Sequence, residues 1–209
     1  MDKSTFRHLY SKGLICELAV MDAINNNLTK KLFAACPYDY FDCTDDVGMY
    51  APYDLMMFCA HKNKKKLPTT NNELRTIEVK SATNGGKYTT FFAEILQTKS
   101  QGYAEYLVKA PTYVVYVDVL TRIHYWYDGD MFTTAVAFAY PKSFQPPGLH
   151  AIGITFDMED PEFGFIGTVY QKDTWPEVIN KHDKRLQEKF KEKKRCRVHK
   201  TAPFLPTLE

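Results

Sequence analysis

The chain has 209 residues, enough for one domain with a short appendage and too few for two full catalytic domains. Its 44% hydrophobic content, with 14 Phe and 14 Tyr for a core, excludes wholesale disorder, and its net charge of +2 points to no partner by itself. The apolar runs are well short of the roughly 20 residues of a membrane-spanning helix, and the N-terminus lacks the apolar stretch of a secretory signal. We therefore expect a cytoplasmic protein with no membrane partner.

The cysteines indicate a reducing environment. There are five of them, an odd number at irregular spacing, and no two form the Cys-x-x-Cys pair of a zinc or redox site. The spacing therefore favours reduced thiols over disulfides or metal ligation at Cys16, Cys36, Cys43, Cys59 and Cys196.

The first half of the chain predicts one long helix followed by strands. Apolar residues recur at steps of three and four between Lys3 and Asn27, and Asn25-Asn26-Asn27 is a helix stop because Asn tolerates left-handed backbone. Short apolar or alternating runs then predict strands, and the Lys- and Thr-rich stretch 61–72 predicts an exposed connection between two of them. The predicted strands are Leu32–Cys36, Tyr53–Ala60 and Leu74–Ser81.

The second half predicts further strands and a terminal helix. Asn84-Gly85-Gly86 is a strong turn signal, after which the chain changes to a mixed segment. The fold class we expect is α/β, with a mixed central β-sheet flanked by helices in residues 1–174 and a basic C-terminal helix and tail in residues 175–209. The later strands are expected at Tyr113–Leu120, Ile123–Tyr127, Ala151–Phe156 and Phe163–Tyr170, with the terminal helix at Trp175–Arg195.

One group of polar residues indicates chemistry. Asp54 opens a predicted strand, and Glu78 and Lys80 lie two apart on the next, so that both project on the same face. If these strands are neighbours, the two carboxylates and the main-chain carbonyl of Val79 form a set of hard oxygen ligands suited to Mg²⁺ or Mn²⁺. Lys80 would then lie beside the metal-bound water, where it could orient the water, help to deprotonate it or stabilise charge on the phosphate.

This pattern resembles the PD-(D/E)XK nuclease superfamily, which has a restriction-endonuclease-like core. The resemblance covers roughly Gly13 to Asp118 and rests on three segments, Gly13-Leu14-Ile15-Cys16-Glu17, Pro52-Tyr53-Asp54 and Ile77-Glu78-Val79-Lys80. Tyr53 interrupts the Pro-Asp pair of the family. The resemblance implies that Glu17 helps to hold the cation or its water, and that Gln97 or Gln101 binds the attacking water or a phosphate.

Each of these residues also has an ordinary structural interpretation. A Glu-x-Lys pair is common on the solvent face of a strand. Glu17, among Leu14, Ile15 and Leu18, is compatible with a salt bridge at the edge of an apolar stripe. Gln97 and Gln101 are compatible with plain exposure on the surface.

Two basic clusters indicate a polyanionic partner. Lys62, Lys64, Lys65 and Lys66 form one, and residues 181–200 hold ten Lys and Arg against three acidic residues. In the second cluster Lys189, Lys193 and Arg197 recur every four residues, which places them on one side of the predicted helix. A solvated helix face or an acidic protein partner would give the same pattern.

Together these features predict a magnesium-dependent DNA endonuclease. A nuclease that acts on RNA remains open, as does a nucleic-acid-binding or assembly protein that kept the fold and lost the chemistry. Intact Asp54, Glu78 and Lys80 argue against that loss. A homodimer is expected by analogy, because cutting both strands needs two sites or one site acting twice. The small size suits an enzyme encoded by a phage or mobile element, which would act in the host cytoplasm.

Overall fold

The structure, a computed structural model, describes residues 3–34, 36, 38, 40–45, 53–60, 74–98 and 102–182. The chain forms two compact units, Met1–Lys172 and Asp173–Glu209. The sequence prediction placed the boundary after residue 174. In the second unit, the described residues are helical over 175–182, within the segment for which a helix was predicted.

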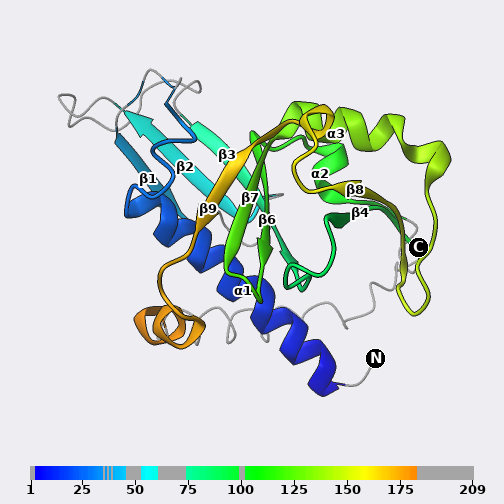
Figure 1. The fold of residues 1–209 in the computed structure, drawn as a ribbon, viewed down its shortest axis with the longest axis horizontal. Helices are drawn as coiled ribbons and strands as arrows, with labels where there is room; N and C mark the ends of the chain where they lie inside the picture. The colour runs from blue at the N-terminus through cyan, green and yellow to red at the C-terminus, as the bar shows by residue number, and fades with distance from the viewer. Residues whose placement is uncertain are drawn as a thin grey trace, which may run out of the picture. The chain divides into compact units, whose positions relative to one another are not determined.

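A mixed sheet forms the centre of the first unit (Figure 1). Its six strands run in the order β1-β2-β3-β6-β7-β9, with β3 and β6 parallel and the other neighbouring pairs antiparallel. The expectation of an α/β fold with a mixed central sheet is therefore confirmed. The strands are β1 (Tyr40–Thr44), β2 (Leu55–Ala60), β3 (Leu74–Ala82), β6 (Tyr113–Asp118), β7 (Ile123–Asp128) and β9 (Phe165–Tyr170).

The long helix α1 (Lys3–Asn25) crosses this sheet and contacts β1 and β3 (Figure 1). Asn25 fixes its end, because the side-chain amide accepts a hydrogen bond from the Cys43 main-chain N–H at 2.7 Å and donates one to the Cys43 carbonyl at 3.1 Å. Asn27 then adopts a φ of 59°, the left-handed conformation expected of the Asn run. The predicted helix and its stop are confirmed.

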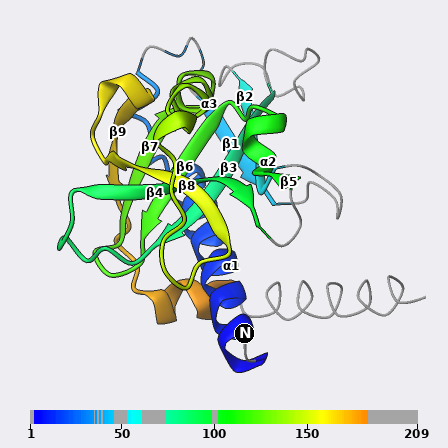
Figure 2. The same cartoon turned by 90° about the vertical axis from the view of Figure 1, so that its right-hand side faces the viewer.

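A smaller sheet and two helices cover the other part of the unit (Figure 2). Aromatic side chains fill the space between this sheet and β6 and β7, where Phe132, fully buried, lies within ring contact of Tyr106, Tyr116, Tyr127 and Phe156. This core supports β3 through its neighbour β6. The elements are β4 (Thr90–Gln97), β5 (Gly102–Tyr103), α2 (Glu105–Val108), α3 (Gly129–Phe138), η2 (Tyr140–Lys142), β8 (Ala151–Asp157) and η3 (Pro161–Phe163).

Most predicted strands are present with small changes at their ends. The exception is Leu32–Cys36, which was predicted as a strand and is wrong: residues 29–34 form turns. Phe33 is held there by ring contacts with Phe41, Tyr113 and Trp126, so a short apolar run serves as an anchor for a turn. The strand of this region is β1, further along the chain. The sequence analysis also missed β4 and α3.

Two further expectations concern the membrane and the cysteines. Within the described part of the chain, no helix has the length and apolar character to cross a membrane. The four cysteines among the described residues are reduced thiols, as predicted, and Cys196 lies outside those residues.

Two glycines provide a matched test of the fold. A Cβ on Gly153 would lie 2.0 Å from the Ala93 carbonyl oxygen and 2.7 Å from Phe92 Cζ, because β8 packs closely on β4 there. We expect Gly153→Ala to lower the free energy of unfolding by about 1–3 kcal/mol. A Cβ on Gly13, inside α1, would meet nothing within 4 Å, so Gly13→Ala should raise it by about 0.5–1 kcal/mol. Urea denaturation measures both, and equal effects would contradict the packing described.

Candidate active site

The candidate site forms where β2 begins beside the middle of β3. The antiparallel register pairs Leu55 with Ile77, and the Asp54 N–H still donates to the Ile77 carbonyl at 3.1 Å. Further along β3, the Val79 N–H donates to Asp54 Oδ2 at 2.7 Å. A side-chain carboxylate therefore takes the place of a main-chain acceptor at the point where the pairing of β3 with β2 stops.

This register brings the predicted ligands together. The pairing ends at Leu55 and Ile77, and the charge of Asp54, the next residue along the chain, reaches Glu78 and raises the pKa of its carboxyl group. Residues two apart in a strand direct their N–H and C=O groups to the same edge, so the Val79 carbonyl faces the β2 side, as that of Ile77 does. The Val79 carbonyl therefore faces the side of β3 on which Asp54 lies, and Asp54 is near enough to Glu78 for their charges to interact.

Lys80 completes the group. Its Nζ lies 2.5 Å from Glu78 Oε1, in an ion pair whose Glu78 side chain is 7% exposed and whose Lys80 side chain is 35% exposed. The parallel register sets Lys80 beside Tyr116 of β6, on the face that carries the aromatic core. The same ammonium lies over the ring of Tyr106, 5.3 Å from its centroid.

Burial and charge shift the proton affinities of this pair. Burial raises the pKa of Glu78 to about 7, against the pull of Lys80, and the negative charges of Asp54 and Glu105 add to the rise. Burial lowers the pKa of Lys80, but the attraction of Glu78, with Asp54 and Glu94 behind it, outweighs burial and leaves the pKa above its ordinary value. Lys80 is therefore an ammonium at neutral pH, next to a carboxyl group that titrates close to neutrality.

Three residues around Lys80 were not placed there by the sequence, from which Tyr106 was expected only as one of three tyrosines that could stack on bases or hydrogen-bond phosphates. Glu94 of β4 and Glu105 of α2 act electrostatically on Lys80 and Glu78, and Tyr106 of α2 is buried against Lys80. These residues come from the segment between β3 and β6, where β4, β5 and α2 lie. No helix was predicted at α2, so the sequence carried no signal for the closeness of Tyr106 to Lys80, which depends on how α2 packs.

The donor set fits a hard divalent cation. Two carboxylates close enough to raise one pKa repel each other in a partly buried site, and a divalent cation would relieve that repulsion. The set consists of two carboxylates and one main-chain carbonyl. Among the described residues, no group of three or more His, Cys, Asp or Glu side chains is arranged to hold a metal ion. Mg²⁺ and Mn²⁺ suit the smaller set because they retain water ligands.

The structure does not bring every predicted residue to this group. Glu17 is half-buried on α1, a helix that contacts β3, and its proposed role remains a prediction. Gln97 is exposed at the end of β4, paired with Gly102 and Ala151 in the smaller sheet, and its role is likewise a prediction. The basic residues lie outside the described residues, namely Lys62, Lys64, Lys65, Lys66, Lys189, Lys193 and Arg197.

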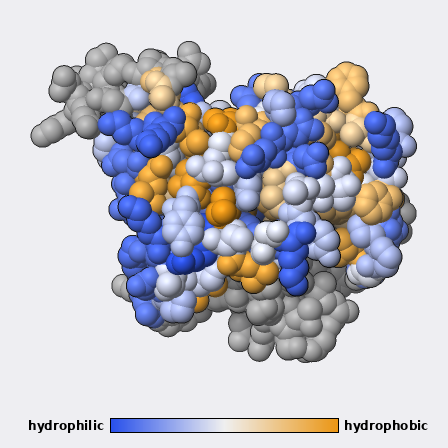
Figure 3. Space-filling model, viewed as in Figure 1, coloured by the Kyte–Doolittle hydropathy of each residue, from blue (hydrophilic) through white to orange (hydrophobic). Residues whose placement is uncertain are grey.

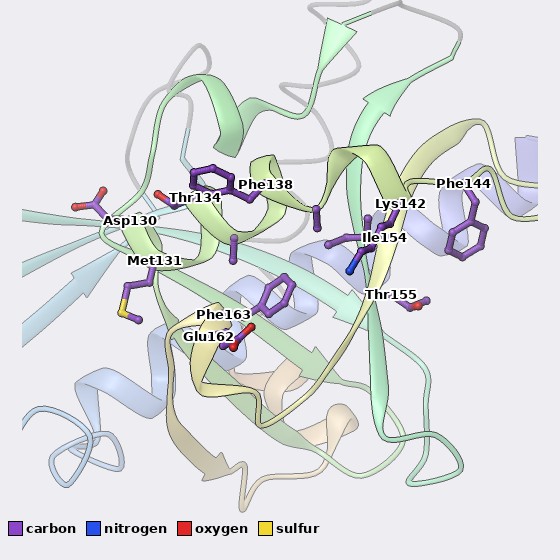
Figure 4. Close-up of a pocket in the computed structure, with 12 residues that line it drawn as sticks. Asp130, Met131, Thr134, Phe138, Lys142, Phe144, Ile154, Thr155, Glu162 and Phe163 are labelled. Carbon is purple, nitrogen blue, oxygen red and sulfur yellow. The ribbon is translucent and has the colours of Figure 1, made fainter.

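A separate hollow of about 860 Å³ lies between α3, β8, η2 and η3. Figure 4 shows Asp130 and Phe138 on α3, with Glu162 and Phe163 coming from η3. Phe138 is 82% exposed. On the face of the molecule seen in Figure 3, apolar and hydrophilic side chains are interspersed. None of the predicted site residues lines this hollow. It therefore supplies a matched set of control positions, Asp130, Glu162 and Lys142.

Comparison of the chain with protein-family models, with curated proteins and with solved structures finds no match. The functional assignment therefore rests on the side chains of the site.

The pKa of Glu78 makes the stability of the metal-free protein fall as pH rises. Its carboxyl group binds a proton more tightly in the folded chain, with a pKa of about 7, than at its ordinary value of 4.5. The resulting stabilisation is present below pH 4.5 and is lost as pH rises through 7. As pH rises from 5 to 8, we expect the ionisation of Glu78 to lower the free energy of unfolding of the wild-type protein by about 1–3 kcal/mol.

Glu78→Gln should remove this pH dependence of the free energy of unfolding. Loss of the ion pair with Lys80 also changes the stability, but by a similar amount at each pH. Urea denaturation over a pH series measures the slope, and the exposed Glu162→Gln is the control. A Glu78→Gln stability curve that runs parallel to the wild-type curve would contradict the shift.

Proposed function

We propose that the protein is a Mg²⁺- or Mn²⁺-dependent deoxyribonuclease that hydrolyses phosphodiester bonds as an endonuclease. One observation carries the proposal: Asp54, bonded to the Val79 N–H, lies at the start of β2 beside Glu78, which is paired with Lys80. Two carboxylates, a main-chain carbonyl and an ammonium grouped where β2 begins beside β3 match the needs of metal-assisted phosphoryl hydrolysis.

The order of elements supports a restriction-endonuclease-like core. A long helix precedes an antiparallel pair, β2 and β3, which carries Asp54 and the Glu-Val-Lys run, and the buried β6 then pairs parallel with β3. This is the order in the PD-(D/E)XK resemblance. In this interpretation β4, β5 and α2 form the crossover between the parallel strands.

Asp54 and Glu78 would hold the cation, with the Val79 carbonyl as the third ligand. A bound Mg²⁺ would polarise a phosphoryl oxygen and lower the pKa of a water ligand. The hydrogen bond from the Val79 N–H fixes one oxygen of the Asp54 carboxylate, which limits the directions in which the other can coordinate. The two carboxylates therefore set where the scissile phosphate must lie.

Lys80 acts as a charge stabiliser in this proposal. In the metal-free protein the attraction of Glu78 outweighs burial and raises the pKa of Lys80, so that its side chain is an ammonium at neutral pH. In-line attack of water builds negative charge on the phosphoryl oxygens as the ester bond to the leaving oxygen breaks. An ammonium held beside Glu78 is placed to stabilise that charge.

The choice of substrates decides between DNA and RNA and between endonuclease and exonuclease action. The sequence shows no extended platform for stacking single strands, which favours an endonuclease. Closed circular duplex separates endonuclease from exonuclease action, because it has no ends. Single-stranded RNA tests the alternative substrate. A homodimer would supply two active sites, one for each DNA strand.

The first functional prediction concerns the three residues of the site. We expect Asp54→Ala, Glu78→Ala and Lys80→Ala each to reduce Mg²⁺-dependent cleavage of circular duplex DNA by about 100-fold or more, because each removes a ligand or the stabilising charge. DNA binding should survive Lys80→Ala and is expected to tighten in Asp54→Ala, since that variant has one fewer repulsive carboxylate. Gel assays of nicking and fluorescence anisotropy measure the two properties.

The matched controls are Asp130→Ala, Glu162→Ala and Lys142→Ala, which change the same classes of side chain around the other hollow. These variants should cleave like the wild type. Full activity in a variant of Asp54, Glu78 or Lys80 would remove that residue from the site. Loss of activity in the control set instead would place the chemistry at the other hollow.

The second prediction concerns the basic segment 181–200. We expect the triple charge reversal Lys189→Glu, Lys193→Glu and Arg197→Glu to weaken DNA binding for all sequences and to leave cleavage positions unchanged, because phosphate contacts carry no sequence information. The slope of log affinity against log salt should shrink by about 0.9 for each DNA phosphate that the variant no longer neutralises. Titrations at several salt concentrations measure this slope.

The control is an equal charge reversal at Lys30, Lys31 and Lys142, which are exposed in the described part of the chain. It lowers the net charge by the same amount, so a general electrostatic effect would change both variants alike. An unchanged slope in the triple variant of the basic segment would indicate a solvated helix face or an acidic protein partner.

A further inference from the structure

We propose that Tyr106 is a positioning residue that holds the Lys80 ammonium over the active site when a divalent cation has taken Glu78. The inference rests on the proposed function. It starts from one contact, the Lys80 Nζ over the ring of Tyr106 at 5.3 Å from the centroid, a distance at which a cation is attracted to an aromatic face.

The ring of Tyr106 is fixed on several sides. Its side chain is 1% exposed, and it contacts Phe132 of α3 at 5.7 Å between ring centroids. Its hydroxyl donates a hydrogen bond to the main-chain carbonyl of Glu94 in β4. The residue before α2, Ala104, is bonded to β4 as well, its N–H donating to the Ile95 carbonyl at 2.9 Å. The ring face toward Lys80 is therefore held in place by the protein.

Lys80 needs this ring face because its ammonium and the metal ion compete for the Glu78 carboxylate. The Lys80 Nζ lies 2.5 Å from Glu78 Oε1, so a cation bound to this carboxylate would repel the ammonium from it. The neighbours that Lys80 keeps then include the Tyr106 face and the negative charge of Glu94. The ring fits this role because it attracts a cation without being able to coordinate the metal in its place.

Tyr106 contributes the ring face and no proton. Burial raises the pKa of its hydroxyl well above the ordinary value, and the nearby charges of Glu94 and Glu78 raise it further. The hydroxyl is therefore neutral at any pH at which the protein would work, and it is already committed to the Glu94 carbonyl.

Kinetics separate the ring from the hydroxyl and from the filling of the core. Tyr106→Phe keeps the ring, while Tyr106→Met fills the space with an unbranched side chain that has no ring. With Mg²⁺ and a DNA duplex, we expect Tyr106→Phe to stay within about twofold of the wild-type kcat, and Tyr106→Met to lose roughly 2- to 30-fold in kcat with little change in KM. Phe156→Met, in the same core, controls for general loosening and should keep the wild-type kcat.

Nuclear magnetic resonance tests the contact without activity. Lysines carry a ¹³C label at Cε, and Lys80→Arg assigns the Lys80 signal by its disappearance. The ring current of Tyr106 should shift the Lys80 ε-methylene protons upfield of those of exposed lysines, both without metal and at saturating Mg²⁺. The shift should persist in Tyr106→Phe and Phe156→Met and should decrease clearly in Tyr106→Met, which removes one of the two rings beside Lys80.

The outcomes distinguish this inference from the proposed function. A wild-type protein that cleaves DNA, with Tyr106→Met as active as Tyr106→Phe, would overturn the positioning role alone. So would a Lys80 signal that moves to the position of exposed lysines when Mg²⁺ binds, or a Tyr106→Phe variant as impaired as Tyr106→Met. A wild-type protein that cleaves no substrate, DNA or RNA, with Mg²⁺ or Mn²⁺ would overturn the proposed function, while a persistent upfield shift would still support Tyr106 as the residue that orients Lys80.

Discussion

The hydrogen bond from the Val79 N–H to Asp54 Oδ2, 2.7 Å long, decides how the site is built. A central strand needs an acceptor for each N–H, and β2, which begins at Leu55 opposite Ile77, does not extend far enough to supply a main-chain carbonyl to Val79. The Asp54 carboxylate meets that need, so one side chain both completes the sheet and faces the candidate metal site. The position of the carboxylate therefore follows from the register of β2 and β3, and a slip of one residue would turn Glu78 and Lys80 to the other face.

The aromatic core explains why this part of the sheet is partly shielded from water. Tyr116 of β6 donates a hydrogen bond to the Phe92 carbonyl at 3.2 Å, which ties the large sheet to β4. Tyr106 bonds to the same strand at Glu94, next to an irregularity in the register between β4 and β8. Both rings lie beside Lys80 on the face of the sheet opposite Ile77 and Val79. The same packing that stabilises the fold removes water from Glu78 and raises its pKa to about 7.

The sequence predicted what local periodicity controls. The α1 stripe, the Asn stop and the paired strands follow from repeats of 3.6 and 2 residues, and the grouping of Asp54 with Glu78 and Lys80 follows from strand alternation once β2 and β3 pair. The failures occur where tertiary contacts decide. Leu32–Cys36 has the composition of a short strand, yet the rings around Phe33 hold it as a turn. Tyr106 lies 26 residues beyond Lys80 in the chain, and only the packing of α2 brings the two together.

The charges of the site support a role for the Glu78–Lys80 pair in the metal-free protein. With Asp54 and Glu78 ionised and Lys80 protonated, the three side chains carry a net charge of −1. The ion pair stabilises this charge in a partly buried place, and the raised pKa of Glu78 allows a proton to neutralise it. A divalent cation would change this net charge to +1, and a bound phosphodiester would bring it to zero. Neither ligand alone gives a neutral site, so in the proposed function the cation and the substrate favour each other's binding, and Lys80 must remain close for the charges to balance.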